Sequence, residues 1–190
     1  MGRAEKDTKD KIIEAACRVL AEKGYDAAST KEIAKAAGVA QGLINYYFSS
    51  KDELFIDVLK AEGRRFCEAM QELRSSLKAE DVYKNAFDNI KDKISHYPQW
   101  YRLRYELYAL GLRNNSMLEE TRLQVEDSRR NISEVLSILC NKPAPELGSV
   151  AAIVFSALEG LALQKLIDER FDFDTAFNEL FKMIHLYTNQ

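Results

Sequence analysis

The chain has 190 residues, of which 46% are hydrophobic and 30% charged, with a formal net charge of −3. This is the composition of an ordinary soluble globular protein that can bury most of its apolar surface. The slightly acidic balance excludes nucleic-acid binding through bulk positive charge, so any DNA footprint must be a local basic patch.

Cysteine and histidine are too few and too scattered to indicate a metal site or a disulfide framework. Cys17, Cys67 and Cys140 are far apart in the chain and show no CxxC spacing. The longest uncharged run, residues 147–158, has twelve residues, whereas a membrane helix needs about 20. The N-terminus is charged and lacks the apolar segment of a signal peptide. We therefore expect a reduced, cytoplasmic protein without a cofactor, metal or membrane partner.

The first predicted element is an amphipathic helix over residues 8–23, which Gly24 ends. Its apolar positions fall on one side: Ile12, Ile13, Ala16, Val19 and Leu20. We expect this helix to support the two short helices that follow it.

Residues 29–48 predict two short helices separated by a tight turn. Ser29 and Glu32 form a capping-box pattern, in which each side chain bonds the backbone amide of the other residue. Gly38 ends the first short helix, because glycine tolerates the left-handed conformation common at helix ends. The second short helix is expected over residues 40–48. Helix, glycine turn and helix is the layout of a helix-turn-helix that reads DNA.

The second short helix contains residues suited to reading bases. Gln41 and Asn45 are four residues apart, so they project from the same face. Both are amides that can pair with adenine edges in a major groove. Leu43 and Ile44 lie between them, where an apolar side chain can contact a thymine methyl group.

The residues that follow are suited to the DNA backbone. Tyr46, Tyr47 and Lys51 have hydroxyl and ammonium groups that can bind phosphate oxygens. The alternative is that the tyrosines are core aromatics, as we expect for Phe48. Ser50 and Glu53 repeat the capping-box pattern and predict the start of a long helix that continues past residue 63 to residue 73.

This stretch resembles the TetR family of bacterial transcription regulators. The resemblance rests on Ile33-Ala34, Ala37-Gly38-Val39, Gly42, Tyr46-Tyr47-Phe48 and Lys51-Asp52-Glu53-Leu54, in this order. It covers about the first third of the chain. Two positions depart from the family pattern. Ala40 stands where the family usually has Ser or Thr for a phosphate contact, and Asn45 stands where it often has Tyr, which indicates an altered base preference.

The resemblance implies an all-α protein with a DNA-binding domain over residues 6–66 and a ligand-binding and dimerisation domain over residues 67–190. It implies a homodimeric repressor, not an enzyme, that a small ligand releases from a palindromic operator in double-stranded DNA. The expected DNA contacts are Ser29, Thr30, Lys31, Ala40, Gln41, Gly42, Leu43, Asn45, Tyr46, Tyr47 and Lys51.

Beyond residue 77 the apolar pattern stays helical, with no strand pattern. One stripe of apolar residues at helical spacing spans residues 83–97. Pro98 fits the first turn of the next helix. That helix is apolar on two faces, which predicts burial, and its tyrosine hydroxyls need polar partners. Because TetR-like proteins bind a small ligand among such helices, we expect aromatic and apolar residues here to form the wall of a ligand pocket. The alternative is that they belong only to the hydrophobic core. The candidates are Phe66, Met70, Phe87, Trp100, Tyr101, Tyr105 and Tyr108.

Two helices on either side of the proline loop at residues 141–145 predict a dimer interface. The second, over residues 146–170, is too apolar for a solvent face, and two such antiparallel helices from each protomer form a four-helix contact. The candidates are Ile132, Leu136, Leu139, Val150, Val154, Leu158 and Leu161. The alternative is that the second helix is the buried centre of a monomer. A last helix is expected over residues 174–187.

The sequence contains no GxSxG, HExxH or phosphate-binding glycine loop. Glu106 and Glu159 interrupt apolar helices, and a buried carboxylate needs a partner. The candidate partners of Glu106 are a cationic ligand, Arg102 and Arg113. The candidate partner of Glu159 is a residue of the second protomer in the dimer. Two alternatives to a ligand-released repressor are a regulator controlled by a partner protein, and a helical ligand-binding or enzyme domain with a vestigial helix-turn-helix.

Overall fold

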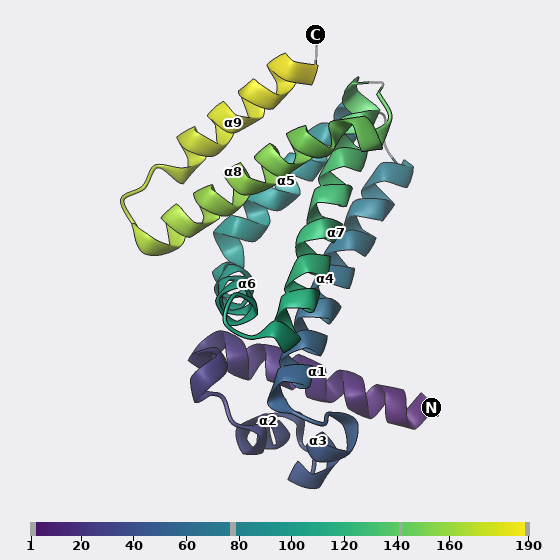
Figure 1. Cartoon of the computed structure of the whole chain (residues 1–190), viewed down its shortest axis with the longest axis vertical. Helices are drawn as coiled ribbons and strands as arrows, with labels where there is room; N and C mark the ends of the chain where they lie inside the picture. Colours follow the sequence, from purple (N-terminus) through teal and green to yellow (C-terminus); the bar gives the residue numbers. More distant parts are fainter. Residues whose placement is uncertain (1–2, 77–78, 141, 189–190) are drawn as a thin grey trace. The chain divides into compact units, whose positions relative to one another are not determined.

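The computed structural model describes residues 3–76, 79–140 and 142–188. The side chains of residues 3–4, 66–67, 69–83 and 116 lie outside this description. Over the described ranges the chain folds into helices and turns, which confirms the predicted all-α class (Figure 1). In chain order the elements are α1 (Arg3–Ala27), α2 (Thr30–Ala37), α3 (Gln41–Tyr47), α4 (Lys51–Ser76), α5 (Ala79–His96), α6 (Pro98–Gly111), α7 (Asn115–Cys140), η1 (Ala144–Leu147), α8 (Gly148–Ile167) and α9 (Phe173–Thr188).

The chain divides into two compact units. The first consists of Met1–Phe66 with Arg102–Thr121, and the second of Cys67–Tyr101 with Arg122–Gln190. The sequence places residues 102–121 in the C-terminal domain, whereas the structure groups them with the first unit. Two bonds tie this segment to α1 and α4: the Tyr25 amide donates to Glu106, and Lys60 forms an ion pair with Glu120 at 2.8 Å.

The core of the first unit is built from the apolar faces of α1, α2 and α4. Its fully buried side chains include Ile12, Leu20, Ile33, Leu54 and Phe55. Each large side chain of this kind stabilises the fold by about 1.5–3 kcal/mol when it leaves water. The core therefore gives the two short helices a rigid support, as the amphipathic pattern of α1 predicts.

The turn between α6 and α7, also in the first unit, is closed by a tight contact. A methyl group added at Gly111 would overlap the Thr121 side chain. The Thr121 hydroxyl donates to the Met117 carbonyl at 2.8 Å, which fixes the side chain in place. The close contact between the backbone of residue 111 and the Thr121 side chain therefore requires glycine at position 111.

In the second unit, α5 packs against α9 through aromatic rings. The Phe87 ring centre lies 5.8 Å from that of Phe177 and 4.9 Å from that of Phe181. The Lys91 ammonium bonds Asp174 at 2.8 Å beside this cluster. Helices α8 and α9 lie side by side and run antiparallel (Figure 1).

The most apolar segment is formed by η1 and α8 together. Ala144–Ile167 has 24 residues with a mean hydropathy of 1.7, enough by length and composition alone to cross a membrane. The run of twelve uncharged residues underestimates the length of this apolar segment, because Glu146 and Glu159 lie within it without interrupting the helical turns. Only 22% of its most apolar stretch is buried inside the chain, and Ile153, Leu163 and Ile167 are exposed along it.

Candidate nucleic-acid interface

Residues at both ends of α2 adopt the predicted local geometry. The Ser29 hydroxyl accepts from the Glu32 amide at 3.2 Å, and the Glu32 carboxylate accepts from the Ser29 amide at 3.2 Å. This confirms the capping box. Gly38 ends the helix in the left-handed conformation, with φ of 67°. Thr30 and Lys31 follow the cap, with Lys31 exposed.

Glu32 gives this helix start a pH dependence. Hydrogen bonds, first from Lys23 and then from Ser29, lower the pKa of Glu32 from 4.5 to about 2. A carboxyl whose pKa is lowered on folding stabilises the protein above its unfolded pKa, and the stabilisation is lost as the pH falls toward the folded pKa. We expect Glu32→Gln to flatten the dependence of the free energy of unfolding on pH between 4.5 and about 2. Urea unfolding across this range measures it, with Glu22→Gln as the control, and an unchanged slope would contradict the assignment.

Helix α3 presents the predicted base-reading side chains to solvent. Gln41, Leu43 and Asn45 are exposed, whereas Ile44 is only 1% exposed and attaches the helix to the core. Of the two apolar candidates, Leu43 alone is therefore available for a thymine methyl group. Ala40 caps the helix without a side-chain bond, as expected from the missing hydroxyl.

The aromatic residues after Asn45 differ in exposure. Tyr46 is 70% exposed and is not a core aromatic, whereas Phe48 is buried as predicted. Tyr47 is half-buried, and its ring meets that of Tyr46 edge-to-face at 5.0 Å. The Tyr46 hydroxyl is thus available to a phosphate, and the Tyr47 ring supports it.

The turn between α3 and α4 differs in one bond from the predicted capping box. The Ser50 hydroxyl accepts from the Glu53 amide at 3.1 Å, as predicted. The Glu53 carboxylate, however, accepts from the amide and hydroxyl of Ser49, both at 2.7 Å. These bonds, the hydroxyl first, lower the pKa of Glu53. The return bond therefore closes one residue earlier and fixes the chain directly after α3.

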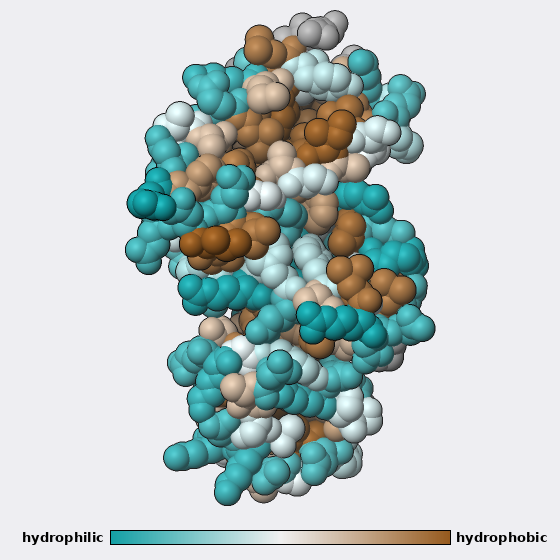
Figure 2. Space-filling view, turned by 60° about the vertical axis from the view of Figure 1, so that its left-hand side comes forward, coloured by the Kyte–Doolittle hydropathy of each residue, from teal (hydrophilic) through white to brown (hydrophobic). Residues whose placement is uncertain are grey.

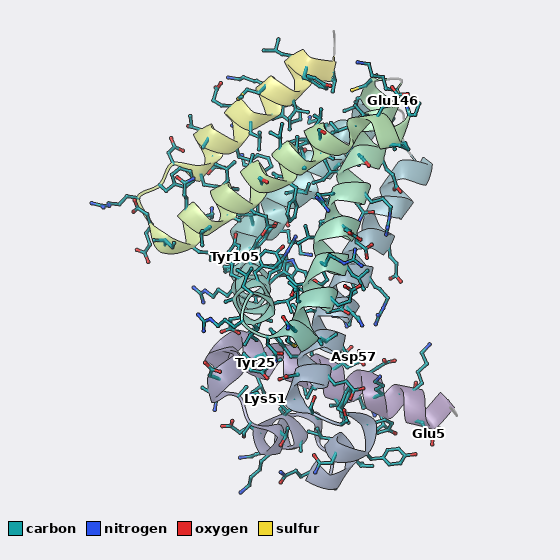
Figure 3. The ribbon with its side chains drawn as sticks, viewed as in Figure 1. Glu5, Tyr25, Lys51, Asp57, Tyr105 and Glu146 are labelled. Carbon is teal, nitrogen blue, oxygen red and sulfur yellow. The ribbon has the colours of Figure 1, made fainter. Side chains whose placement is uncertain are left out.

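Lys51 is held at the edge of the helix-turn-helix (Figure 3). Its Nζ lies 4.4 Å above the centre of the Tyr25 ring and donates to the Asp26 carbonyl at 3.3 Å. The Tyr25 hydroxyl donates to Asp52, and its ring packs 4.9 Å from that of Phe55. Burial, and then Asp52, raise the pKa of Tyr25. Because an ammonium has three donors, Lys51 keeps others for a phosphate.

Glu106 has a partner that sequence reasoning missed. It accepts a hydrogen bond from the Tyr25 amide at 2.8 Å, whereas the pairing with an arginine or a cationic ligand stays a prediction. Glu159 has a buried carboxylate oxygen in the second unit, and its role across a dimer stays a prediction. Among the side chains that the structure describes, no group of three or more His, Cys, Asp or Glu residues could hold a metal ion.

The predicted pocket residues are divided between the two units. Phe87, Trp100 and Tyr101 belong to the second unit and are buried, and Lys93 Nζ lies 4.5 Å from the Trp100 ring centre. Tyr105 and Tyr108 belong to the first unit and are half-buried, with ring centres 6.2 Å apart. The side chains of Phe66 and Met70 lie outside the described residues. The assignment of all seven to one pocket stays a prediction.

The predicted dimer residues include three that belong to the core of one protomer. Leu136 is 2% exposed, Val154 5% and Leu158 6%. Side chains that their own chain covers this closely offer little surface to a second copy, and the assignment of these three residues to the interface stays a prediction. The remaining candidates, Ile132, Leu139, Val150 and Leu161, are half-buried.

Exposed apolar side chains lie elsewhere on α8 and α9. They are Ile153, Leu163 and Ile167 on α8, and Met183, Leu186 and Tyr187 on α9. We call these six residues the apolar face. Figure 2 shows hydrophobic residues gathered in patches among hydrophilic residues on one face of the molecule. Periodicity could not separate the apolar face from the core, because α8 is apolar nearly all round.

Comparison with known proteins identifies the region that contains the helix-turn-helix. Residues 12–58 match the family model described as bacterial regulatory proteins, tetR family. The chain is 44% identical over 61 residues to the fatty acid metabolism regulator protein of Bacillus subtilis, which is 32% of this chain but only 31% of that relative.

Two further comparisons extend over most of the chain. It is 22% identical over 180 residues to the HTH-type transcriptional regulator QacR of Staphylococcus aureus, covering 91% of this chain and 95% of the relative. The crystal structure of the transcriptional regulator FadR from Bacillus subtilis in complex with stearoyl-CoA superposes with a TM-score of 0.71 at 19% identity, covering 92% of this chain and 96% of that one. At this identity the likeness shows the shared fold.

Proposed function

The chain belongs to the TetR family of bacterial transcription regulators, and we propose that it is a homodimeric repressor released from a palindromic operator by a small ligand. The observation that carries the proposal is α3, on which Gln41, Leu43 and Asn45 are exposed above the buried Ile44. A helix with two exposed amide side chains on one face, Gln41 and Asn45, can read base edges in a major groove. The relatives are transcription regulators, which does not favour a vestigial helix-turn-helix on an enzyme.

The apolar face supports the dimer. A two-fold axis brings the same surface of both copies together, and α8 and α9 from each would form a four-helix interface. The low burial of Ala144–Ile167 within one chain is explained if a second copy covers it. We prefer this partner to a membrane, because an operator with two half-sites needs two recognition helices about one duplex turn apart. A repressor bound to the chromosome is cytoplasmic.

The first effector to test is a long-chain acyl-CoA. FadR from Bacillus subtilis, which shares this fold, was solved with stearoyl-CoA. The predicted pocket residues Trp100 and Tyr101, both in the second unit, would offer apolar rings to an acyl chain, and the Tyr101 hydroxyl would suit its polar end. By linkage, the factor by which the effector weakens DNA binding is the factor by which DNA weakens effector binding.

The proposal is tested by selecting bound duplexes from a random DNA pool with the purified protein at near-physiological salt. We expect enrichment of a two-fold symmetric site, because the two copies of α3 read identical half-sites. Addition of stearoyl-CoA should release the selected duplex. A folded, dimeric sample that enriches no sequence would contradict the proposed function.

Two substitutions separate base reading from backbone contact. We expect Gln41→Ala to lower the preference for the selected site by about 1–3 kcal/mol, because one amide contact to a base edge is lost. Lys51→Ala should weaken binding to all sequences alike and reduce the slope of log affinity against log salt by about one per protomer. Fluorescence anisotropy over a salt series measures both effects. Lys84→Ala, at an exposed lysine of α5, is the control, and identical behaviour of the Gln41 and Lys51 variants would refute the division of roles.

A further inference from the structure

Glu106 on α6 meets the end of α1 within the first unit. Its Oε2 accepts from the Tyr25 amide at 2.8 Å. Its Oε1 would lie 2.8 Å from a Cβ at Gly24, so a larger residue at position 24 would require the Glu106 carboxylate to shift. Gly24 also has φ of 78°, a conformation that other residues rarely adopt. The positive φ favours glycine at position 24, and the absence of a Cβ leaves room there for the Glu106 carboxylate.

The turn that Glu106 holds is also the turn that holds Lys51. The Tyr25 ring lies beneath the Lys51 ammonium, and the Asp26 carbonyl accepts from it. The charges of Asp26 and Lys51 act on Glu106 directly: burial is the largest cause of its raised pKa, Asp26 raises it further and Lys51 lowers it. One carboxylate therefore fixes the backbone of Tyr25 and attracts the cation above its ring.

We propose that Glu106 is a positioning residue for DNA binding, which holds the Gly24–Tyr25 turn so that the Lys51 ammonium stays at the phosphate-facing edge of α3. This inference rests on the proposed function, because Lys51 acts here as a phosphate contact. Without Glu106, the Tyr25 amide loses its acceptor and the turn can rotate. The Tyr25 ring and the Asp26 carbonyl then no longer define one position for the ammonium.

The test compares Glu106→Ala with Glu106→Gln in the full-length protein, using a labelled duplex that carries the selected operator. Glu106→Ala should bind about tenfold more weakly, the size of one charge-assisted hydrogen bond. Its salt slope should fall by about one per protomer, as for loss of one phosphate contact. Glu106→Gln keeps an acceptor for the Tyr25 amide and should bind within about twofold of the wild type.

The salt slope separates positioning from simple loss of stability, because a smaller folded fraction lowers the apparent affinity without changing the slope. Glu120→Gln is the matched control, since it removes a carboxylate that pairs with Lys60 of α4, in the same unit. In Glu106→Ala the further substitution Lys51→Ala should add little, because the contact is already lost.

The outcomes separate this inference from the proposed function. A wild-type protein that binds no duplex refutes the proposed function itself. A wild type that binds, with Glu106→Ala showing an unchanged salt slope, overturns the positioning role. If Glu106→Gln fails as severely as Glu106→Ala, the hydrogen bond is not what holds Lys51, and the proposal is wrong.

Discussion

Glutamate in place of Ile153 or Ile167 should convert the proposed dimer to monomers and abolish tight operator binding. Ile153 is 69% exposed and Ile167 76% exposed on α8 of a single chain, and both belong to the apolar face. A carboxylate buried there without a partner costs on the order of 3–5 kcal/mol, and two-fold symmetry places each substitution in the interface twice. We therefore expect operator affinity to fall more than about a hundredfold, because a monomer engages one half-site.

Size-exclusion chromatography with light scattering at micromolar protein measures the change in mass, and anisotropy measures the change in affinity. Leu112→Glu is the matched control, because Leu112 is 83% exposed at the end of α6 and lies outside the apolar face. A dimer that persists in both α8 variants would refute this interface. Dissociation by Leu112→Glu alone would place the interface elsewhere.

Phe55→Ala should cost the first unit about 3–5 kcal/mol of unfolding free energy, the range for removing a buried aromatic ring. Phe55 is 0% exposed on α4, and its ring packs against that of Tyr25. Leu54, Val58 and Leu59 on the same helix are also almost fully buried, so the ring is lost from a densely packed core, where a cavity adds to the cost.

Urea unfolding followed by circular dichroism measures this loss. Ile56→Ala on the same helix is the control, since Ile56 is only half-buried and should lose less. A loss below about 1 kcal/mol for Phe55→Ala, close to the range of a surface site, would show that Phe55 does not anchor α4 to α1. The variant should also lower DNA affinity at temperatures where it stays folded, because the Tyr25 ring beneath Lys51 loses its support.

The part of the site that could be predicted from sequence depends on contacts between near neighbours in the chain. Ser29 and Glu32 are three residues apart, so their reciprocal bonds follow from the residue types alone. Gly38 marks a helix end because few other residues adopt its positive φ. Glu53 shows the limit of such reasoning, since its carboxylate had both Ser49 and Ser50 within reach and bonded Ser49.

Contacts between distant segments could not be predicted. Glu106 and Tyr25 are 81 residues apart, and an acidic residue in an apolar helix indicates only that some partner exists. Val154 and Ile153 are adjacent and equally apolar, yet one lies in the core and the other is exposed. Hydrophobic patterning has no means of telling the core of a protomer from a surface that a second copy covers.

The closed turn between α6 and α7 has a consequence for the evolution of related sequences. Gly111 and Thr121 compete for one volume, and the branched Thr121 side chain has little rotamer freedom with which to yield. Positions 111 and 121 should therefore co-vary among homologues that keep this turn: a side chain at 111 is compatible with glycine at 121, but not with threonine. An ancestor could pass from one pairing to the other only through an intermediate that is small at both positions.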